Sequence, residues 1–409
     1  MKILFAVHGY KPAWRVGGPV VSVSSLAEGL VRRGHEVTVF TTNSNLDEDL
    51  DVPTDCIVDV CGVNVRYFKR IEPIKRYLPH LKYFNQSIGS LYAPEMHAAL
   101  DGLAPNMDLI HTHLPFNYPT LAASRAAKRW NLPLFYHQRG VFDPERLKFR
   151  ALKKKIYLAI VEKPILRQAT TLIALTGAEV DSYRALGINT PCCVIPNGVD
   201  TPLDRTVDSD NLASVTFGIE PHHIVVLFMG RLHPTKGADR LLLAFERIAE
   251  EFPNALLILA GPDEFDIERD FVLRVQERGL AHQVHFPGMV SGDEKSALLH
   301  RANLFCLPSD AEGFSMAILE ALAHKTAVLI SPRCFFSQVE HSGAGLIADP
   351  NVDALAVSLH KLLSQPDKLI EMGNAGYKLV AAEYSWNHIT DKMIGAYEEG
   401  VDRFKKSLI

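Results

Sequence analysis

The second half of this chain alternates short apolar runs with segments of helical periodicity, and this alternation constrains the fold more than any other feature. Continuous apolar runs separated by helical segments are typical of parallel strands that are buried on both faces. Strands linked by helices in this way form an open, doubly wound sheet. We therefore expect a parallel sheet whose strands lie at residues 224–229, 256–260, 284–286, 304–307 and 327–330.

The first half begins with the same kind of unit. An apolar strand at 1–7 precedes a loop with Gly17 and Gly18, a helix at 20–33 and a second strand at 36–41. The loop has no Gly-x-Gly-x-x-Gly pattern and no acidic residue ends the second strand, so dinucleotide binding is disfavoured. A chain of 409 residues is also too long for one typical core. The sequence therefore predicts an α/β protein with two Rossmann-like, doubly wound domains.

The polar segment 200–220 is expected to contain the boundary between the two domains. We assign residues 1–200 to an N-terminal domain, 201–385 to a C-terminal domain and 386–409 to a final helix.

Charge and composition restrict the surroundings of the protein. Residues 1–200 hold 24 Lys and Arg against 18 Asp and Glu, whereas the remainder holds 19 against 29. The basic half is expected to meet an anionic partner or surface, and no nucleic acid is expected. No run of about 20 apolar residues is present, and the apolar amino terminus is too short for a secretory signal. We expect a cytoplasmic protein whose six cysteines, without a Cys-x-x-Cys pair, are reduced.

A loop and the helix after it carry two acidic residues at a functional spacing. Glu312 follows the strand predicted at 304–307, and a helix is expected to begin near Phe314 or Ser315. The free N–H groups of a first helical turn can hold phosphate or sugar oxygens, and Gly313 lets the backbone come close to a ligand. Glu320 lies roughly 12 Å further along that helix, so the two carboxylates can contact two ends of one long ligand. The alternative is an ordinary acidic helix entry.

This spacing of Glu312 and Glu320 resembles the signature of the retaining glycosyltransferases of family 4, the "glycosyl transferases group 1" type. Other segments are similar to that family in order and separation along nearly the whole chain, including FMGRLHPTKG (228–237) and VIPNGVD (194–200). The resemblance implies a GT-B fold, in which two Rossmann-like domains face each other across a cleft. The final helix at 386–409 would then pack back on the first domain.

The resemblance also implies an activity. It implies transfer of a hexosyl unit from a nucleotide-diphosphate sugar to a saccharide or lipid-linked saccharide, in the synthesis of cell-surface polysaccharide such as lipopolysaccharide. Neither a cofactor nor an essential metal is expected. Two alternatives remain open: a sugar-nucleotide epimerase of the same fold, and a catalytically silent sugar-nucleotide binding protein.

Roles in the donor site follow from the same resemblance. Glu312 would lie near the transferred sugar and Glu320 would hold the ribose. Arg231 and Lys236 would bind the diphosphate, unless they belong to a solvated basic loop. The base would lie near Gly288, Met289 and Val290. The donor phosphates would lie near the backbone of Gly17 and Gly18, unless these two glycines form a plain tight turn. The phosphates or the sugar would also lie near the backbone of Gly313, Phe314 and Ser315.

Roles in the first domain concern the sugar and the acceptor. His113, at the end of the strand in DLIHTHLPFN (108–117), would contact the transferred sugar. A metal site is conceivable, because His111 and His113 lie on one face of a strand, but the sequence shows no third ligand. Arg139 resembles an Arg of polysaccharide-assembling members and is assigned, with Asn117, to the acceptor side.

Two further segments give testable expectations. Residues 147–157 are predicted to form a basic amphipathic helix, which either rests on anionic lipid or is a solvated helix with an apolar core face. After Glu320, Lys325 stands where the family has a glycine, so it must take the glycine conformation or the turn differs.

Overall fold

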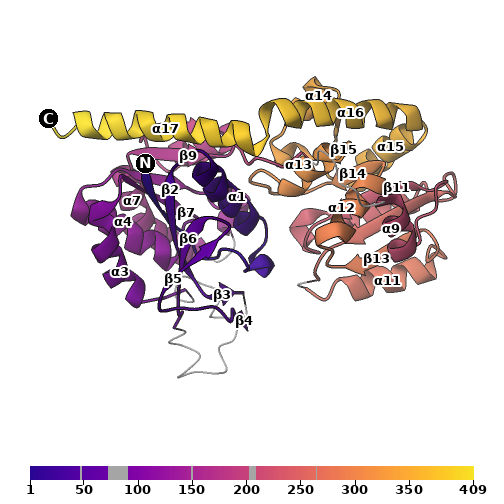
Figure 1. Cartoon of the computed structure of the whole chain (residues 1–409). Coiled ribbons are helices and arrows are strands. Elements are labelled where there is room, and N and C mark those ends of the chain that lie inside the picture. The colour runs from indigo at the N-terminus through magenta and orange to yellow at the C-terminus, as the bar shows by residue number, and fades with distance from the viewer. Residues whose placement is uncertain (47, 72–90, 149–150, 202–208, 264) are drawn as a thin grey trace. The chain divides into compact units, whose positions relative to one another are not determined.

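The computed structural model describes residues 1–46, 48–71, 91–148, 151–201, 209–263 and 265–409 (Figure 1). They divide into two compact units. Unit 1 comprises Met1–Gly198 with Trp386–Ile409, and unit 2 comprises Val199–Ser385. Each unit is built on its own largely parallel sheet, which confirms the predicted α/β class with two Rossmann-like domains.

Unit 1 contains an eight-stranded sheet in the order β10–β9–β8–β7–β1–β2–β6–β5. Neighbouring strands are parallel except β5 and β6, which pair antiparallel at one edge. β1 has β2 on one side and β7 on the other, so the strand order reverses beside β1. In open α/β sheets, ligands bind at the carboxyl ends of the strands at such a point. The strands are β1 (Lys2–Ala6), β2 (Glu36–Thr42), β5 (Ile57–Val60), β6 (Val63–Phe68), β7 (Leu109–His113), β8 (Leu134–His137), β9 (Thr171–Ala174) and β10 (Cys192–Val194), with a separate pair β3 (Ser44–Asn45) and β4 (Glu48–Asp49).

The helices of unit 1 cover this sheet. One hydrophobic cluster joins Leu4, Ile110 and Tyr136 of the sheet with Leu100 and Leu166 of the helices. The helical segments are α1 (Gly18–Arg32), α3 (Glu95–Leu103), α4 (Tyr118–Trp130), α5 (Pro144–Lys148), α6 (Ala151–Tyr157), the π-helical η4 (Leu158–Glu162), α7 (Lys163–Gln168), α8 (Gly177–Ala185) and α17 (Trp386–Lys406).

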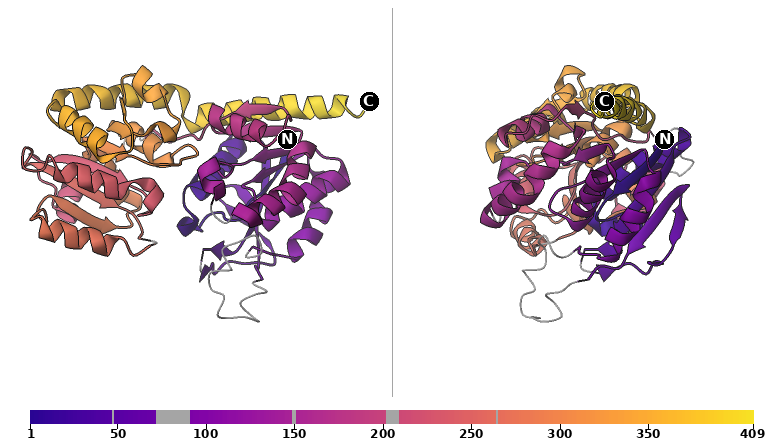
Figure 2. Two further views of the ribbon diagram at one scale, coloured as in Figure 1. Left: turned by 180° about the vertical axis from the view of Figure 1, so that it is seen from behind. Right: turned by 90° about the vertical axis from the view of Figure 1, so that its left-hand side faces the viewer.

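The final helix α17 belongs to unit 1, along which it runs (Figure 2). It packs directly on α1, because Gly29 has no side chain at the crossing; a Cβ there would lie 2.3 Å from the Thr390 hydroxyl. Arg33 donates to Asp391 at 2.8 Å at the same contact. The predicted return of the last helix to the first domain is therefore confirmed.

Unit 2 contains a six-stranded parallel sheet in the order β13–β12–β11–β14–β15–β16. Its strands are β11 (Ile224–Met229), β12 (Ala255–Ala260), β13 (Val284–Gly288), β14 (Leu304–Leu307), β15 (Ala327–Ile330) and β16 (Gly345–Ile347). The sequence predicted the first five of these within a few residues. The chain runs outward from β11 toward β12 on one side and later to β14 on the other, so the loops that end β11 and β14 lie side by side.

The helices of unit 2 are α9 (Ser209–Phe217), α10 (Ala238–Glu246), α11 (Glu268–Glu277), α12 (Gly292–Arg301), α13 (Met316–Ala323), α14 (Gln338–His341), α15 (Val352–Leu363) and α16 (Pro366–Glu383). Across the described part of the chain, no helix is long and apolar enough to cross a membrane.

The turn after α13 shows which backbone conformation Lys325 adopts. Lys325 has a φ of +62°, in the left-handed region that glycine adopts most easily. Its carbonyl packs so closely on α16 that a Cβ at Gly373 would lie 1.8 Å from it. Lys325 therefore takes the conformation that the missing glycine would have taken.

Candidate active site

The loops that follow β11 and β14 bring Lys236 and Glu312 together. The Lys236 ammonium forms an ion pair with the Glu312 carboxylate. Their side chains are only 15% and 7% exposed, so water screens this pair weakly. Two residues that are 76 positions apart in sequence thus form one ion pair at the carboxyl edge of the sheet.

Neutral and charged hydrogen bonds hold these two loops in register. Asp310 donates its backbone N–H to the Thr235 carbonyl at 2.8 Å. Its carboxylate accepts two bonds from Arg240, at 2.8 and 2.9 Å, and such bidentate pairs fix geometry as well as adding energy. Gly237 allows the contact, because it has φ +77° and a Cβ there would lie 2.3 Å from the Pro308 carbonyl oxygen.

Arg231 lies on the same edge of the sheet, directly after β11, and its side chain is exposed. The ends of β11 and β12 approach closely beside it. A Cβ at Gly261 would lie 1.8 Å from the Gly230 carbonyl oxygen, and Gly261 has a φ of +148°. Only glycine fits this approach, which sets the backbone path that presents Arg231.

Gly313, Phe314 and Ser315 lead from Glu312 into α13, which begins at Met316. Phe314 packs its ring on Phe336 and Tyr384, with centroids at 4.8 and 5.7 Å, so its side chain belongs to the core. Ser315 is the N-cap residue, and its side chain makes no capping hydrogen bond. The segment therefore offers backbone N–H groups of the first helical turn rather than side chains.

Glu320, on the same helix α13, has a partner that sequence reasoning missed. Lys295 on α12 donates to the Glu320 carboxylate at 2.7 Å, and the two side chains are 30% and 19% exposed. Nothing in the local sequence distinguishes Lys295 from other surface lysines, because its partner is 25 positions away on the next helix.

The three residues assigned to the base end β13 and begin the next loop. Gly288 has a φ of +71° and accepts a hydrogen bond from the Gly261 N–H at 2.8 Å. Met289 is 56% exposed, and Val290 is partly exposed. This loop therefore lies at the same edge of the sheet as Arg231.

In unit 1, Arg139 is the centre of a buried polar cluster. It has a φ of +53° and is 7% exposed. Its guanidinium donates to the Ser22 hydroxyl at 2.7 Å, to the Asn197 side-chain oxygen at 3.1 Å and to Nδ1 of His113 at 3.3 Å. Burial lowers the pKa of Arg139 to about 10, so the group stays charged at neutral pH.

His113 lies in this cluster with two other buried histidines, His111 and His137. The sequence pointed only to His111 and His113. Burial, with the nearby Arg139 charge, lowers the pKa of all three well below the ordinary value, so they are neutral. Their candidate ligand atoms lie within 4.8 Å of one another.

This histidine cluster is poorly suited to a divalent cation for two physical reasons. The Arg139 guanidinium adds a positive charge beside it. Because Nδ1 of His113 accepts from Arg139, the neutral ring carries its proton on Nε2, which then has no lone pair for a metal. The ring of His111 is held instead by the Tyr397 hydroxyl at 2.7 Å.

The other residues predicted in unit 1 have clear local roles. Asn117 caps α4, because its side chain accepts from the Thr120 N–H at 2.8 Å and donates to the Leu114 carbonyl at 2.7 Å. Gly17 precedes α1 with a φ of +93°, and Gly18 is the first residue of that helix. Ser22 of α1 connects this glycine loop to Arg139.

Two buried carboxylates of unit 1 were also missed. Burial raises the pKa of Glu162 and of Glu179 to about 7. Glu162 accepts from the Phe116 N–H at 2.7 Å and from the Tyr136 hydroxyl at 2.6 Å. Glu179 accepts from the Leu175 N–H at 2.8 Å. Glutamates on amphipathic helices ordinarily face water, so no sequence signal marks these two as buried.

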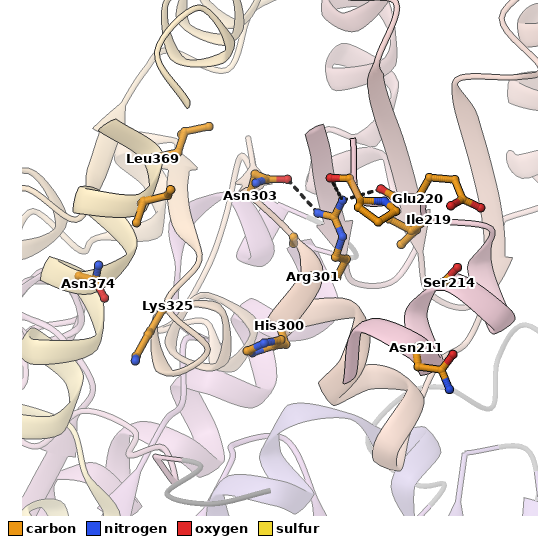
Figure 3. Close-up of a pocket in the computed structure, with 13 residues that line it drawn as sticks. Asn211, Ser214, Ile219, Glu220, His300, Arg301, Asn303, Lys325, Leu369 and Asn374 are labelled. Atoms are coloured by element: carbon orange, nitrogen blue, oxygen red, sulfur yellow. Dashed lines mark hydrogen bonds between the residues drawn. The ribbon is translucent and has the colours of Figure 1, made fainter. Parts of the chain in front are cut away.

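A pocket of about 680 Å³ lies elsewhere in unit 2 (Figure 3). It is lined by Asn303, Lys325 and Arg301, near the amino ends of β11 and β14, and by residues of α9 and α16. Arg301 points its guanidinium at the carbonyl of Glu220 at 2.7 Å (Figure 3). It also donates to the carbonyl of His223 at 2.9 Å. This pocket is at the opposite end of the strands from Lys236, and none of the predicted site residues lines it.

Comparison with known proteins places this chain in a family. A model described as "Glycosyl transferases group 1" matches residues 214–379, and a "Glycosyl transferase 4-like domain" model matches residues 17–198. An uncharacterized glycosyltransferase of Methanocaldococcus jannaschii is 29% identical, covering 97% of this chain and 98% of that protein. A D-inositol 3-phosphate glycosyltransferase of Gordonia bronchialis is 26% identical, covering 95% and 85%.

Solved structures agree on the fold. Anabaena HepE, crystallised in complex with UDP and glucose, superposes with a TM-score of 0.73 at 19% identity, covering 98% of this chain and 100% of that one. The two family models together match most of the chain, and the relatives match it over nearly its full length. The chain therefore belongs to the group 1 glycosyltransferases of family 4, and it is a glycosyltransferase with the GT-B fold.

Proposed function

We propose that this glycosyltransferase moves a hexosyl unit, with retention of configuration, from a nucleotide-diphosphate sugar to a saccharide or lipid-linked saccharide. The observation that carries the proposal is the largely buried ion pair of Lys236 and Glu312, at the strand edge where Arg231 also emerges and near which α13 begins. A diphosphate needs fixed cations and N–H donors, and a transferred sugar needs a hydrogen-bond acceptor. This edge offers all three.

The donor diphosphate would lie on Arg231, Lys236 and the first-turn N–H groups of α13. Departure of a nucleoside diphosphate leaves negative charge on its oxygens, and preorganised cations stabilise that charge as it forms. In a retaining transfer the leaving phosphate oxygen can accept the proton of the attacking hydroxyl. Glu312 would hold the transferred sugar, and no essential metal is part of the proposal.

The nucleoside end of the donor would lie along α13 toward Glu320. A carboxylate that accepts two ribose hydroxyls is a common solution for nucleotide recognition. Glu320 is already oriented by Lys295, so little side-chain freedom is lost on binding. The base would contact the loop of Gly288, Met289 and Val290. HepE was solved with UDP and glucose, which makes a uridine nucleotide the first donor to test.

Unit 1 would supply the acceptor side, through Arg139 and Asn117, and a sugar contact through His113. Gly17 and Gly18 would approach the donor phosphates by backbone alone. Relatives named D-inositol 3-phosphate glycosyltransferases act on a phosphorylated polyol, which adds such a compound to the acceptors worth testing. We favour an acceptor of cell-surface polysaccharide or lipopolysaccharide synthesis and a peripheral location on the inner face of the membrane.

A thermal-shift screen tests the donor. The purified protein is heated with UDP, GDP, ADP and their sugar conjugates, first with a chelator and then with magnesium. A ligand at about 100 times its Kd stabilises the folded state by about 2.7 kcal/mol. We expect a shift with one nucleotide class in the presence of the chelator, and none in Lys236→Ala. Lys361→Ala, an exposed lysine of unit 2, is the matched control.

Product analysis then separates the alternatives. A glycoside whose anomeric configuration equals that of the donor supports the retaining transferase. Conversion of the donor to an epimer without any acceptor would indicate the epimerase. Tight nucleotide binding without turnover on a panel of lipid-linked and phosphorylated acceptors would indicate the silent binder. A metal-dependent shift, lost with the chelator, would contradict the metal-free site.

A further inference from the structure

Large apolar side chains are exposed on loops at the carboxyl edge of the unit 1 sheet. Trp14 follows β1, Leu46 follows β2 and Ile71 follows β6, and they are 47%, 43% and 46% exposed. The carbonyl of Tyr92, which is 40% exposed, accepts a hydrogen bond from the Ile71 N–H at 2.8 Å. We call these four residues the apolar strip.

The position of the strip distinguishes it from another exposed apolar group of unit 1. Leu152 and Ile156 of α6 are 75% and 53% exposed, on the helix predicted at 147–157, of which residues 149 and 150 lie outside the described residues. The strip instead lies where the strands end, beside the point at which the strand order reverses. Ligands of open α/β sheets bind at this place.

Hydrogen bonds join the loops that carry the strip. In the loop after β1, the Arg15 N–H donates to the Asn45 side-chain oxygen, in the loop after β2, at 3.1 Å. Arg70, which follows β6, donates to the Leu46 carbonyl at 2.8 Å. The strands β1, β2 and β6 are neighbours, about 4.8 Å apart, so the strip covers roughly 10 Å of the edge. This is wider than a single pyranose ring.

The backbone that carries Trp14 is fixed by its neighbours. The Trp14 N–H donates to the Pro12 carbonyl at 2.7 Å, and its carbonyl accepts from the Gly17 N–H at 3.0 Å. Tyr10 and Ala13 are fully buried below it. The exposure of the Trp14 ring is therefore set by the fold, three residues before the glycine that is proposed to approach the donor phosphates.

The charged side chains along the strip are paired. Arg15 forms an ion pair with Glu48 at 2.9 Å, and Arg70 forms one with Asp49. The Glu48 and Asp49 side chains are 67% and 49% exposed, so both carboxylates remain accessible. Each pair is neutral as a whole, and each holds carboxylate oxygens that can accept from hydroxyl groups. The edge therefore suits a neutral ligand that is rich in hydroxyls.

We propose that the apolar strip binds sugar units of the acceptor that lie behind the reacting hydroxyl, so that the acceptor is an oligosaccharide of neutral sugars. One face of a pyranose ring presents C–H groups, which pack on an aromatic ring such as that of Trp14. The hydroxyls around the ring would donate to Glu48 and Asp49. Apolar and aromatic side chains with a few placed polar groups are typical of small-ligand sites.

This inference rests on the proposed transfer to a saccharide and narrows that acceptor to a chain of several sugars. The acyl or prenyl chain of a lipid would gain from the apolar side chains alone. It would bury the two Arg–carboxylate pairs without offering them hydrogen bonds, and that burial is costly. The paired charges between the apolar residues thus favour a glycan over a lipid chain.

Glycan titration of the full chain tests the proposal without any nucleotide. Glucose, mannose, galactose and rhamnose, and the linear oligosaccharides of each, are titrated and followed by calorimetry and by intrinsic fluorescence. We expect at least one series in which affinity rises with chain length and tryptophan fluorescence changes on binding. A wild-type protein that binds no oligosaccharide more tightly than its monosaccharide would overturn the proposal.

Variants of Trp14 locate the binding surface. Trp14→Ala is expected to weaken binding of the longer oligosaccharides about tenfold and to leave monosaccharide binding unchanged, whereas Trp14→Phe should keep most of the affinity. The matched control is Trp130→Ala, because Trp130 is 40% exposed on the same unit and ends α4. With a donor in hand, Trp14→Ala should raise the KM for long acceptors without lowering kcat, the sign of a contact remote from the reacting atoms.

Independent readouts keep the outcomes distinct. Thermal unfolding and the nucleotide-induced shift should be unchanged in Trp14→Ala, which shows that the chain folds and that the donor site is intact. If the wild type shows no nucleotide shift, the donor proposal fails, while the glycan titration still decides the role of the strip. The strip proposal fails if Trp14→Ala and Trp130→Ala bind glycans equally. It also fails if a prenyl phosphate changes the tryptophan fluorescence and no glycan does, or if Trp14→Ala separates a dimer in sedimentation.

Discussion

The ion pair of Lys236 and Glu312 allows its structural and ligand-binding contributions to be measured separately. We predict that Lys236→Met destabilises unit 2 in the absence of ligand, because it leaves the Glu312 carboxylate, 7% exposed, without its cation. The double variant Lys236→Met with Glu312→Gln should recover much of that stability, because a neutral amide is far cheaper to bury than an unpaired charge.

The expected size follows from the burial of the pair. Charge-assisted hydrogen bonds contribute about 1.5–3 kcal/mol, and breaking a buried pair costs about 3–5 kcal/mol at the upper end. Lys236 is 15% exposed, so we take a cost of about 2 kcal/mol for the single variant. For a unit of this size, about 2 kcal/mol lowers the melting temperature by roughly 4–8 °C.

The assay is a double-mutant cycle read by scanning calorimetry, which resolves separate transitions if the two units unfold independently. Each of the four proteins is measured with and without the nucleotide that shifts the wild type. We expect the double variant to regain stability but not the nucleotide shift, because the cation that binds phosphate is still missing. Glu312→Gln alone should keep most of the nucleotide shift and lose turnover.

Two results would refute this reasoning. If Lys236→Met and the double variant melt at the same temperature, the carboxylate is not coupled to Lys236. If Lys236→Met retains the full nucleotide shift, Lys236 does not bind the donor, whatever its part in stability.

Three further predictions concern other parts of the molecule. Glu162→Gln should flatten the pH dependence of stability. The folded pKa of Glu162 is raised to about 7, so its contribution to stability is present below about pH 4.5 and is lost as pH rises through 7. The difference is about 3 kcal/mol, and melting curves at pH 5 and pH 8 will show it. Gly261→Ala should lower the free energy of unfolding by about 3 kcal/mol or more in calorimetry, because its Cβ would lie 1.8 Å from a carbonyl oxygen. Gly218→Ala, with open space around it, should lower it by only about 1 kcal/mol. Equal losses in the two variants would contradict the argument. Glu320→Ala should raise the Kd for the nucleotide about tenfold or more by titration calorimetry, and an unchanged Kd would remove Glu320 from the ribose site.

The sequence predicted the sheet of unit 2 well, and the reason is physical. Strands β11, β14 and β15 are buried parallel strands, so each is a continuous apolar run ended by polar loop residues. For Lys325 the resemblance left two outcomes open, and the structure shows the left-handed one, with a φ of +62°. Local chemistry determines the buried strands, so they can be predicted from the sequence alone.

Contacts between remote segments could not be read in this way. Lys295 meets Glu320 across two helices, and His137 joins His111 and His113 across neighbouring strands. Glu162 is buried because its helix turns that side to the sheet. In each case the residue type suggests a solvent-exposed or isolated role, and only the tertiary packing assigns a partner.

The two units hold their buried cations by different means, and this difference bears on ligand selection. Arg139 has hydrogen-bond partners that are neutral, namely Ser22, Asn197 and His113, and burial lowers its pKa. Lys236 already has a carboxylate partner. A phosphate that binds Lys236 must therefore compete with Glu312 for the ammonium, and a single phosphate group gains little from that exchange. A diphosphate gains more, because its two phosphoryl groups can also reach Arg231 and the N–H groups of α13, while a sugar hydroxyl can replace the ammonium at Glu312. Selection for a nucleotide-diphosphate sugar over simple phosphate would follow from this exchange.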